Sequence, residues 1–384
     1  MTAEPLPPGY RRNFWCLTMD FCFFGIGLAF LGPGTVVPSF LTELGASSTV
    51  IGLLTTLQRA GWLLPQLVAA RYLSDKPYKK PFILLPAGIS RLMILILAAL
   101  IYVTGTRRPA LVITALMVAM GIFWLGDGLA SLAWFDFLSK SVPAYRRGRL
   151  TSIGQILSGI ASFAAGFGVE WLLSDRGPAY PTNYAVLFLL GFAMLAVSFT
   201  AITLTRENKG IAGDRVPSWG EYLPQLGKLL KRDHAFRRYL IARQVFNLAG
   251  LGTPFYIVYA LDRLNLPAHV VGRYTSLGVI GTITAALLFG WLNERHGTKR
   301  TSEVGVIVTV AIPVLALVIP RIVTNPTLLA WAYGLVFLAS NASMACSLPG
   351  WASYILEWAP EAERPIYMGL TNTINGLAAL FAVL

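Results

Sequence analysis

The chain is largely a succession of apolar stretches, each long enough to cross a lipid bilayer as a helix. About 20 consecutive apolar residues suffice, because a helix rises about 1.5 Å per residue. That length predicts eleven spans: 14–41, 48–72, 81–104, 110–138, 150–173, 184–204, 239–261, 268–292, 302–320, 327–356 and 366–384. Only 13% of the residues are charged, about half the share of a soluble domain. We therefore expect an all-α polytopic membrane protein.

Lysine and arginine are distributed unequally between the two sets of loops that join these spans. The set that begins with Arg11 and Arg12 carries 21 of them, and the alternate set carries 5. Loops rich in Lys and Arg stay in the cytoplasm, so residues 1–13 are predicted to be a cytoplasmic tail. The expected location is the plasma membrane of a prokaryote (its inner membrane), crossed many times. The net charge of +13 lies in these loops and does not indicate nucleic-acid binding.

The longest polar stretch, 205–238, separates the sixth predicted span from the seventh. It is the expected cytoplasmic linker between an N-terminal bundle, 14–204, and a C-terminal bundle, 239–384. Within this stretch, leucines near helical spacing have basic neighbours. The pattern predicts an amphipathic helix on the membrane surface, and the alternative is a solvated linker.

Two features occur once in each half, and their copies are separated by nearly the same length of chain. The charged loop 71–80 has a similar counterpart at 290–300, and Trp134 has its counterpart in Trp351. Two related bundles around a central site are typical of secondary transporters.

The duplicated loop carries the residues by which the chain resembles the major facilitator superfamily of secondary transporters. The motif of that family, G-x-L-x-D-R-x-G-R-[KR]-[KR], follows its second helix and is echoed after its eighth. The second copy here matches at Gly290, Leu292, Glu294, Arg295, Gly297, Lys299 and Arg300; the first keeps Leu73, Asp75, Lys76, Lys79 and Lys80. The first copy departs from the motif at Arg71 and Tyr78, where the family has glycine.

The resemblance implies a fold of two six-helix bundles. By that standard the last helix, and part of the eleventh, are missing from this chain. We therefore expect the C-terminal bundle, 239–384, to be truncated to five helices, so that the 384 residues are either a fragment or the product of a truncated gene.

The resemblance also implies alternating access, by rocking of the two halves about a midplane site. In such transporters the acid of the loop helps to close the inner gate. Here Asp75 would have that role, with Arg146, Arg147 or Arg149 nearby. Alternatively, the basic residues of these loops only set the orientation of the chain in the membrane. The predicted gating residues are Asp75, Lys76, Lys80, Arg147, Gly290, Glu294, Arg295, Gly297 and Lys299.

Asp20, Arg59, Arg91 and Asp127 are ionisable residues deep inside predicted spans, where each charge costs at least about 2.5–3.5 kcal/mol. Counting along the spans places Arg59, Arg91 and Asp127 roughly 15–20 Å from the inner surface, and Asp20 roughly 10 Å from it. Asp20 is the candidate for proton coupling, because a lone carboxylate in an apolar helix takes up a proton more readily than one in water. Alternatively, Asp20 could be the partner of a nearby basic residue. Arg91 and Asp127 could instead form a structural ion pair.

Polar and aromatic residues at helical spacing predict an aqueous cavity for the solute. The candidate substrate-binding residues are Arg59, Trp62, Gln66, Arg91, Trp124, Asp127, Gln155, Asn247, Asn341 and Asn372. Aromatic faces with a few hydrogen-bonding groups suit a sugar or a nucleoside, and the arginines would also suit an organic anion. The small residues Gly159 and Gly166 are read as helix packing.

The sequence thus predicts a secondary active transporter for a small organic solute, coupled to protons, with sodium as the alternative ion. Import of a sugar-like solute is slightly favoured over efflux of amphiphiles, because the fifth span lacks the Gly-Pro pair common in drug–proton antiporters. A non-transporting receptor or assembly factor is the other alternative.

We expect no enzymatic activity, since no phosphate-binding loop or catalytic motif is present. No cofactor or metal is expected, and the protein is expected to act as a monomer.

Overall fold

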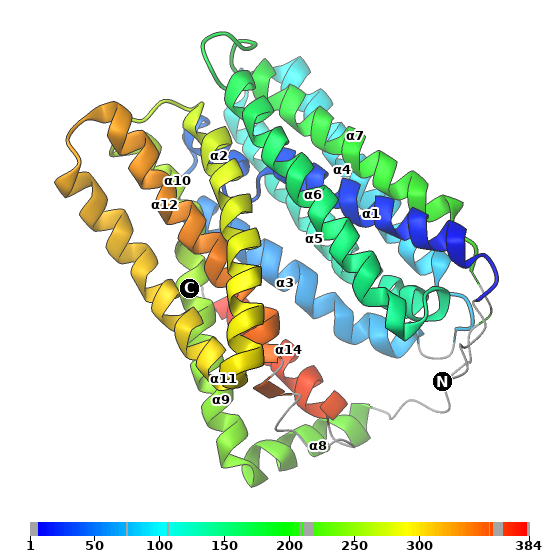
Figure 1. Cartoon of the computed structure of the whole chain (residues 1–384). Helices are drawn as coiled ribbons and strands as arrows, with labels where there is room; N and C mark the ends of the chain where they lie inside the picture. Colours follow the sequence, from blue (N-terminus) through cyan, green and yellow to red (C-terminus); the bar gives the residue numbers. More distant parts are fainter. Residues whose placement is uncertain are drawn as a thin grey trace. The chain divides into compact units, whose positions relative to one another are not determined.

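The computed structural model describes residues 7–73, 76–105, 107–207, 209, 219–352, 354–355 and 364–381. All regular secondary structure in these ranges is helical (Figure 1). The helices are α1 (Tyr10–Leu31), α2 (Val36–Glu43), α3 (Ser48–Leu73), α4 (Lys80–Thr104), α5 (Pro109–Ser141), α6 (Ala144–Leu172), α7 (Thr182–Leu204), α8 (Trp219–Arg232), α9 (His234–Ala249), η1 (Gly250–Gly252), α10 (Thr253–Asp262), α11 (Val270–Ile322), α12 (Pro326–Ala345), η2 (Ser347–Ala352) and α14 (Arg364–Phe381). Of these, η1 is a short 3₁₀-helix and η2 is a π-helix.

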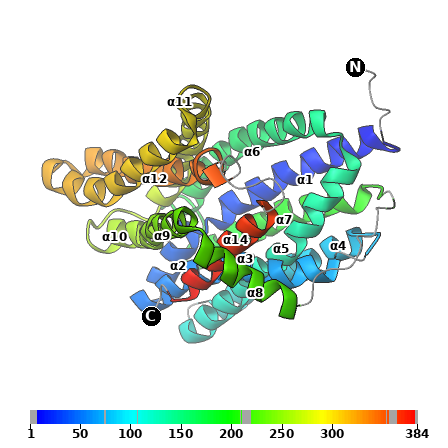
Figure 2. The ribbon, with the colours of Figure 1, turned by 90° about the horizontal axis from the view of Figure 1, so that it is seen from below.

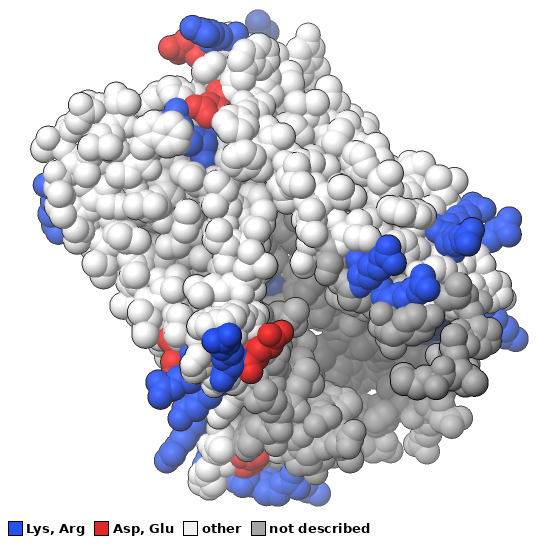
Figure 3. Space-filling model, in the orientation of Figure 1, with Lys and Arg blue, Asp and Glu red and all other residues white. Residues whose placement is uncertain are grey.

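The surface of the helices is that of a protein surrounded by lipid. Within the described ranges, seven helical segments are long and apolar enough to cross a membrane. Large apolar side chains are widely exposed, including Leu85 at 70% and Val103 at 79%. Charged side chains leave wide uncharged areas on the visible face (Figure 3). The prediction of an all-α, multi-pass membrane protein is confirmed.

Two predicted spans are interrupted at corresponding positions of the sequence. Span 14–41 is divided into α1 and α2 by a turn at Gly32, whose φ of +49° favours glycine. Span 239–261 is divided into α9 and α10 by η1, which begins at Gly250. Gly250 follows Gly32 at nearly the same offset along the chain as the repeated features follow one another. Helices interrupted at equivalent places in two halves mark the binding region in many transporters.

The second copy of the repeated loop is a tight turn. Helix α11 contains one residue with a non-helical backbone, Gly297, at φ 79° and ψ 171°. This conformation is open essentially only to glycine. The residue separates the two predicted spans 268–292 and 302–320, so the loop is shorter than the sequence suggested.

The chain forms two compact units, each assembled from separate segments. Unit 1 comprises Met1–Leu31, Leu57–Ser162 and Pro178–Val216. In it, α1 packs along α7, and α4 packs against both α5 and α7 (Figures 1 and 2). Its core includes Phe14, Leu17 and Phe137, which are almost fully buried.

Unit 2 comprises Gly32–Thr56, Phe163–Gly177 and Pro217–Leu384. In it, α11 packs along α12 and η2, and α2 packs against α10. Its core includes Phe236, Phe289 and Tyr367. The division into 14–204 and 239–384 with a linker at 205–238 stays a prediction. Within that linker the structure places α8, whose Leu229 is buried against the core of unit 2.

Candidate functional site

Asp20 lies in the middle of α1 and is buried in unit 1. Both oxygens of its carboxylate accept a hydrogen bond. The indole Nε1 of Trp134, on α5, donates to Oδ2 at 2.7 Å. The hydroxyl of Ser198, on α7, donates to Oδ1 at 2.6 Å. Three helices therefore hold this carboxylate in place, as a buried acid requires.

Arg91, on α4, is a buried cation of the same unit, with 8% of its surface exposed. Its Nη1 donates to the Ala87 carbonyl at 3.2 Å and to the Ser90 hydroxyl at 3.1 Å. The guanidinium lies 5.7 Å from the centre of the Phe24 ring, and its buried Nε has no hydrogen-bond partner in the described part of the chain. It interacts electrostatically with both Asp127 and Asp20.

Asp127, on α5, accepts a hydrogen bond from Trp62 on α3. One turn away on each helix, the amide of Gln66 lies 3.5 Å from the hydroxyl of Ser131. Asp20, Arg91 and Asp127 thus interact within one unit, and we call these three residues the charge cluster. All three residues were candidates from the sequence, where Arg91 and Asp127 were a possible ion pair and Asp20 was considered apart from them.

The other candidates in unit 1 differ in their surroundings. Arg59 is half-buried on α3 and makes contacts there. Trp124 is buried on α5, and its Nε1 has no hydrogen-bond partner among the described residues. Gln155 is exposed on α6. The structure therefore brings Trp62 to the charge cluster and leaves Gln155 on the surface of its helix.

The candidates in unit 2 are also dispersed. Asn247, on α9, donates to the side-chain oxygen of Asn375 on α14 at 3.0 Å, and Gln244 donates to the same oxygen at 2.6 Å. Asn341 instead donates to the Phe337 carbonyl of its own helix at 3.0 Å. Asn372 is exposed on α14. Only Asn247 of the three predicted residues takes part in a polar cluster.

The first copy of the repeated loop is held by two acids that the sequence analysis did not identify. Glu207 accepts hydrogen bonds from the backbone N–H groups of Lys79 and Lys80, at the start of α4, where a helix favours negative charge. Asp136, in the last turns of α5, lies 3.7 Å from the Lys79 ammonium and 2.8 Å from that of Lys140. The ammonium of Lys80 donates to two carbonyls at the end of α7.

Of the other predicted gating residues in this region, Lys76 is half-buried and makes contacts. Asp75 and the side chain of Arg147 lie outside the described residues.

The second copy is exposed and forms local contacts. The side chains of Glu294, Arg295 and Lys299 are exposed, and Arg295 lies 5.2 Å from the Trp291 ring of its own helix. A Cβ added at Gly290 would meet open space, so no described neighbour approaches this glycine closely. Gly297 forms the turn described above.

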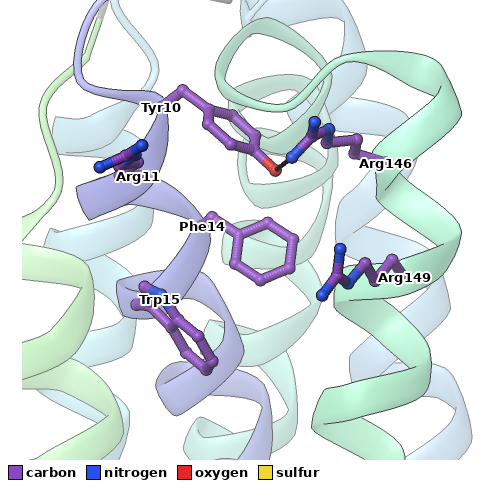
Figure 4. A pocket seen from close by; sticks show the side chains of 6 residues that line it. All are labelled: Tyr10, Arg11, Phe14, Trp15, Arg146 and Arg149. Atoms are coloured by element: carbon purple, nitrogen blue, oxygen red, sulfur yellow. Dashed lines mark hydrogen bonds between the residues drawn. The ribbon is translucent and has the colours of Figure 1, made fainter.

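A pocket of about 440 Å³ opens between the first turns of α1 and of α6 (Figure 4). It is lined by Tyr10, Arg11, Phe14, Trp15, Arg146 and Arg149. Arg146 donates to the Tyr10 hydroxyl at 3.4 Å and lies over its ring. Asp20 does not line this basic pocket and lies about 7.5 Å further along α1 than Trp15.

Within unit 2, the end of α6 packs closely against the start of α11. Arg273 forms an ion pair of 2.7 Å with Glu170 and lies 4.0 Å from the Trp331 ring. The hydroxyl of Ser276 donates to the Phe163 carbonyl at 2.9 Å. A Cβ added at Gly272 would overlap the backbone of α6, so only glycine permits this approach. Neither Glu170 nor Arg273 was among the candidate site residues predicted from the sequence, although both are charged and lie inside predicted spans.

Comparisons with known proteins agree with this architecture. Residues 240–384 match the sequence profile of the Major Facilitator Superfamily. A solved POT family transporter, in complex with a thioalcohol-conjugated peptide, superposes with a TM-score of 0.71 at 12% identity, covering 98% of this chain and 91% of the other. A D-xylose–proton symporter superposes with a TM-score of 0.70 at 15% identity, covering 98% and 89%. The nucleoside transporter NupG gives 0.69 at 15% identity, covering 97% and 89%.

Among curated proteins, the uncharacterized protein Rv2209 of Mycobacterium tuberculosis is 26% identical over 259 residues, which is 66% of this chain and 48% of the relative. The chain spans about half the length of the curated relatives it matches. The resemblance to the major facilitator superfamily is confirmed, and the chain has the fold of its members.

Proposed function

We propose that the chain is a proton-coupled secondary transporter that moves a small polar organic solute by alternating access. Its N-terminus would lie in the cytoplasm of a prokaryotic cell and the monomer would be the working unit. The observation that carries the proposal is the charge cluster, a group of three ionisable side chains inside a membrane-spanning unit. Such groups are costly in a membrane and usually mark ion or substrate pathways.

The charge cluster contains two carboxylates and one guanidinium. With Asp20 and Asp127 both ionised and Arg91 protonated, its charge is −1, and binding of one proton would bring it to zero. A group shielded from water is most easily held when its charges balance. One proton taken up on one side of the membrane and released on the other is what coupling requires.

The partners of Asp20 suit a carboxyl group that changes its protonation state. An ionised carboxylate accepts from both Trp134 and Ser198. A protonated one must donate through one oxygen, and the Ser198 hydroxyl can turn from donor to acceptor, whereas an indole N–H can only donate. The proton would therefore reside on Oδ1, which faces Ser198, while Trp134 keeps the carboxyl group in position.

The contact between α6 and α11 supports alternating access. The ion pair of Glu170 with Arg273 joins a segment of the predicted N-terminal half to the predicted C-terminal half. A contact of this kind has to separate when a pathway opens at that end of the molecule.

The side chains near the charge cluster favour a polar solute. Trp62, Gln66 and Trp124 offer aromatic faces and amide groups, which suit hydroxylated compounds such as sugars. Among the solved structures of similar fold is a D-xylose–proton symporter, which gives this class some support. Efflux of lipophilic cations is the alternative, with the two acids as the cation-binding groups.

The test is a thermal-shift screen followed by a flux measurement. Ligand binding raises apparent stability by mass action. The purified protein is screened at pH 5.5 and 7.5 against sugars, nucleosides, organic acids and lipophilic cations. A stabilising solute should then accumulate in proteoliposomes under an imposed pH gradient, and a protonophore should abolish the accumulation. Binding without any flux would reject transport in favour of a receptor, and stabilisation by lipophilic cations alone would favour efflux.

A further inference from the structure

Unit 2 contains a half-buried cation that has no anionic partner in the described part of the chain. The guanidinium of Arg243, on α9, donates through Nη2 to the Ser347 hydroxyl at 3.4 Å. Its Nη1 is buried and has no hydrogen-bond partner among the described residues. The titratable groups that interact with it there are the phenol of Tyr239 and the thiol of Cys346, and neither carries a charge at neutral pH. A charge in this setting is costly unless an anion joins it.

The surroundings of Arg243 hold the guanidinium in a fixed orientation. It lies 5.3 Å from the ring centres of both Phe246 and Trp351, which orient a planar cation through their faces. The Tyr239 hydroxyl donates to the Trp351 carbonyl at 2.9 Å and so fixes that side of the site. Ser347 and Trp351 both belong to the π-helix η2, a form that is frequent at functional sites.

A second set of polar groups lies on the same helix. Asn247 is one turn beyond Arg243, on the same face of α9. Gln244 and Asn247 both donate to Asn375, which leaves the buried Oε1 of Gln244 without a donor among the described residues. An unsatisfied acceptor on the same helix as the cation suits a solute that carries both a negative charge and hydroxyl groups.

The repeats give the two units opposite charges at related positions. Trp134 and Trp351 are repeat partners. In unit 1 the indole donates to Asp20, whereas in unit 2 the ring of Trp351 faces Arg243 and its Nε1 has no partner among the described residues. Trp134 thus contacts an acid, and its repeat partner Trp351 contacts a cation.

We propose that Arg243, Ser347 and Trp351 bind the negatively charged group, a carboxylate or a phosphate, of a hydroxylated solute. The inference rests on the proposed transport function and narrows its substrate class. Arg243 would form charge-assisted hydrogen bonds with the anion, for which a planar guanidinium is well suited.

The experiment compares pairs of probes that differ in charge: glucuronate with glucose, and glycerol 3-phosphate with glycerol. Thermal stability of the full chain in detergent is measured at constant ionic strength. We expect at least one anion to raise the melting temperature while its neutral counterpart does not. Arg243→Gln should weaken the apparent affinity for that anion about tenfold or more. The two pairs distinguish a carboxylate from a phosphate.

Two further variants separate binding from folding. Arg243→Lys keeps the charge without the planar fork, so it should retain the fold and bind the anion more weakly than the wild type. Arg263→Gln removes an exposed cation from unit 2 and serves as the matched control, with unchanged affinity. Melting temperatures without ligand and gel-filtration profiles identify any variant that fails to fold.

The proposal is overturned if no anion stabilises the protein, if the neutral counterparts stabilise it equally, or if Arg243→Lys and Arg243→Gln bind the anion as the wild type does. Proteoliposome flux separates this outcome from failure of the proposed function. Transport of neutral solutes alone would reject the anion site and keep the transporter, whereas anion binding without flux would keep the site and reject transport.

Discussion

At the scale of single residues, the cost of a charge in a membrane was the most productive signal. It selected Asp20, Arg91 and Asp127 from the sequence, and the structure places these three together. Ser198 gave no such signal, because serine and threonine in apolar helices commonly bond to their own backbone, as Thr200 does here. Its contact with Asp20 joins distant parts of the sequence and depends on the packing of α1 against α7.

Trp134→Phe tests the role of the indole at Asp20. The substitution keeps an aromatic ring but removes one hydrogen bond to a carboxylate, a loss of about 1.5–3 kcal/mol. We expect proton-driven uptake to fall about tenfold in proteoliposomes. Trp15→Phe, which changes an exposed tryptophan on the same unit, should leave uptake unchanged. Equal uptake by the two variants would contradict the role.

At the scale of elements, hydropathy located the spans but not their breaks. A window of apolar residues reports burial in lipid and carries little information on backbone dihedral angles. The turn at Gly32 and the 3₁₀-helix that begins at Gly250 therefore went unnoticed inside spans 14–41 and 239–261. Gly297, which was predicted only as a gating residue of the repeated motif, has the backbone conformation of a turn.

The two glycines of that motif are expected to respond differently to alanine. Gly297→Ala forces a side chain into a conformation that costs about 1–3 kcal/mol, so the melting temperature should fall by several degrees. Gly290 is helical with open space around it, so Gly290→Ala should leave the melting temperature unchanged or raise it slightly. A similar fall in the melting temperature of both variants would show that the backbone conformation at Gly297 does not require glycine.

At the scale of the whole molecule, segments of both predicted halves belong to one compact unit. Residues 32–56 and 163–177 pack with the chain beyond residue 217. Sequence alone could not reveal this, because it predicts which helices exist and not which of their ends meet. The contact of α6 with α11 depends on one conformation of the molecule, and alternating access requires that it open.

A crosslink should therefore stop transport. The hydroxyls of Thr35 and Thr275 lie 3.0 Å apart within unit 2. Oxidation of the double variant Thr35→Cys/Thr275→Cys should reduce uptake to background, and a reducing agent should restore it. Either single cysteine variant, treated in the same way, is the control. Full uptake by the crosslinked protein would mean that this contact stays closed during transport.

The charges on solute and proton should also balance. If a monoanion held at Arg243 travels with one proton held at Asp20, no net charge crosses the membrane. A potential of 100 mV, worth about 2.3 kcal/mol per charge, should then leave the uptake rate unchanged. Uptake that accelerates with an inside-negative potential would mean that the solute is neutral or that more than one proton accompanies it.

The most direct test of the account measures proton movement through the Asp20→Asn variant. Proteoliposomes containing a trapped pH-sensitive dye receive the solute identified by the thermal-shift screen, without an imposed gradient. The wild type should acidify the lumen as solute enters. Asp20→Asn should exchange labelled solute across the membrane yet move no protons, while Asp262→Asn, an exposed acid on α10, should behave as the wild type. Solute-driven acidification at the wild-type rate in Asp20→Asn would contradict the central claim.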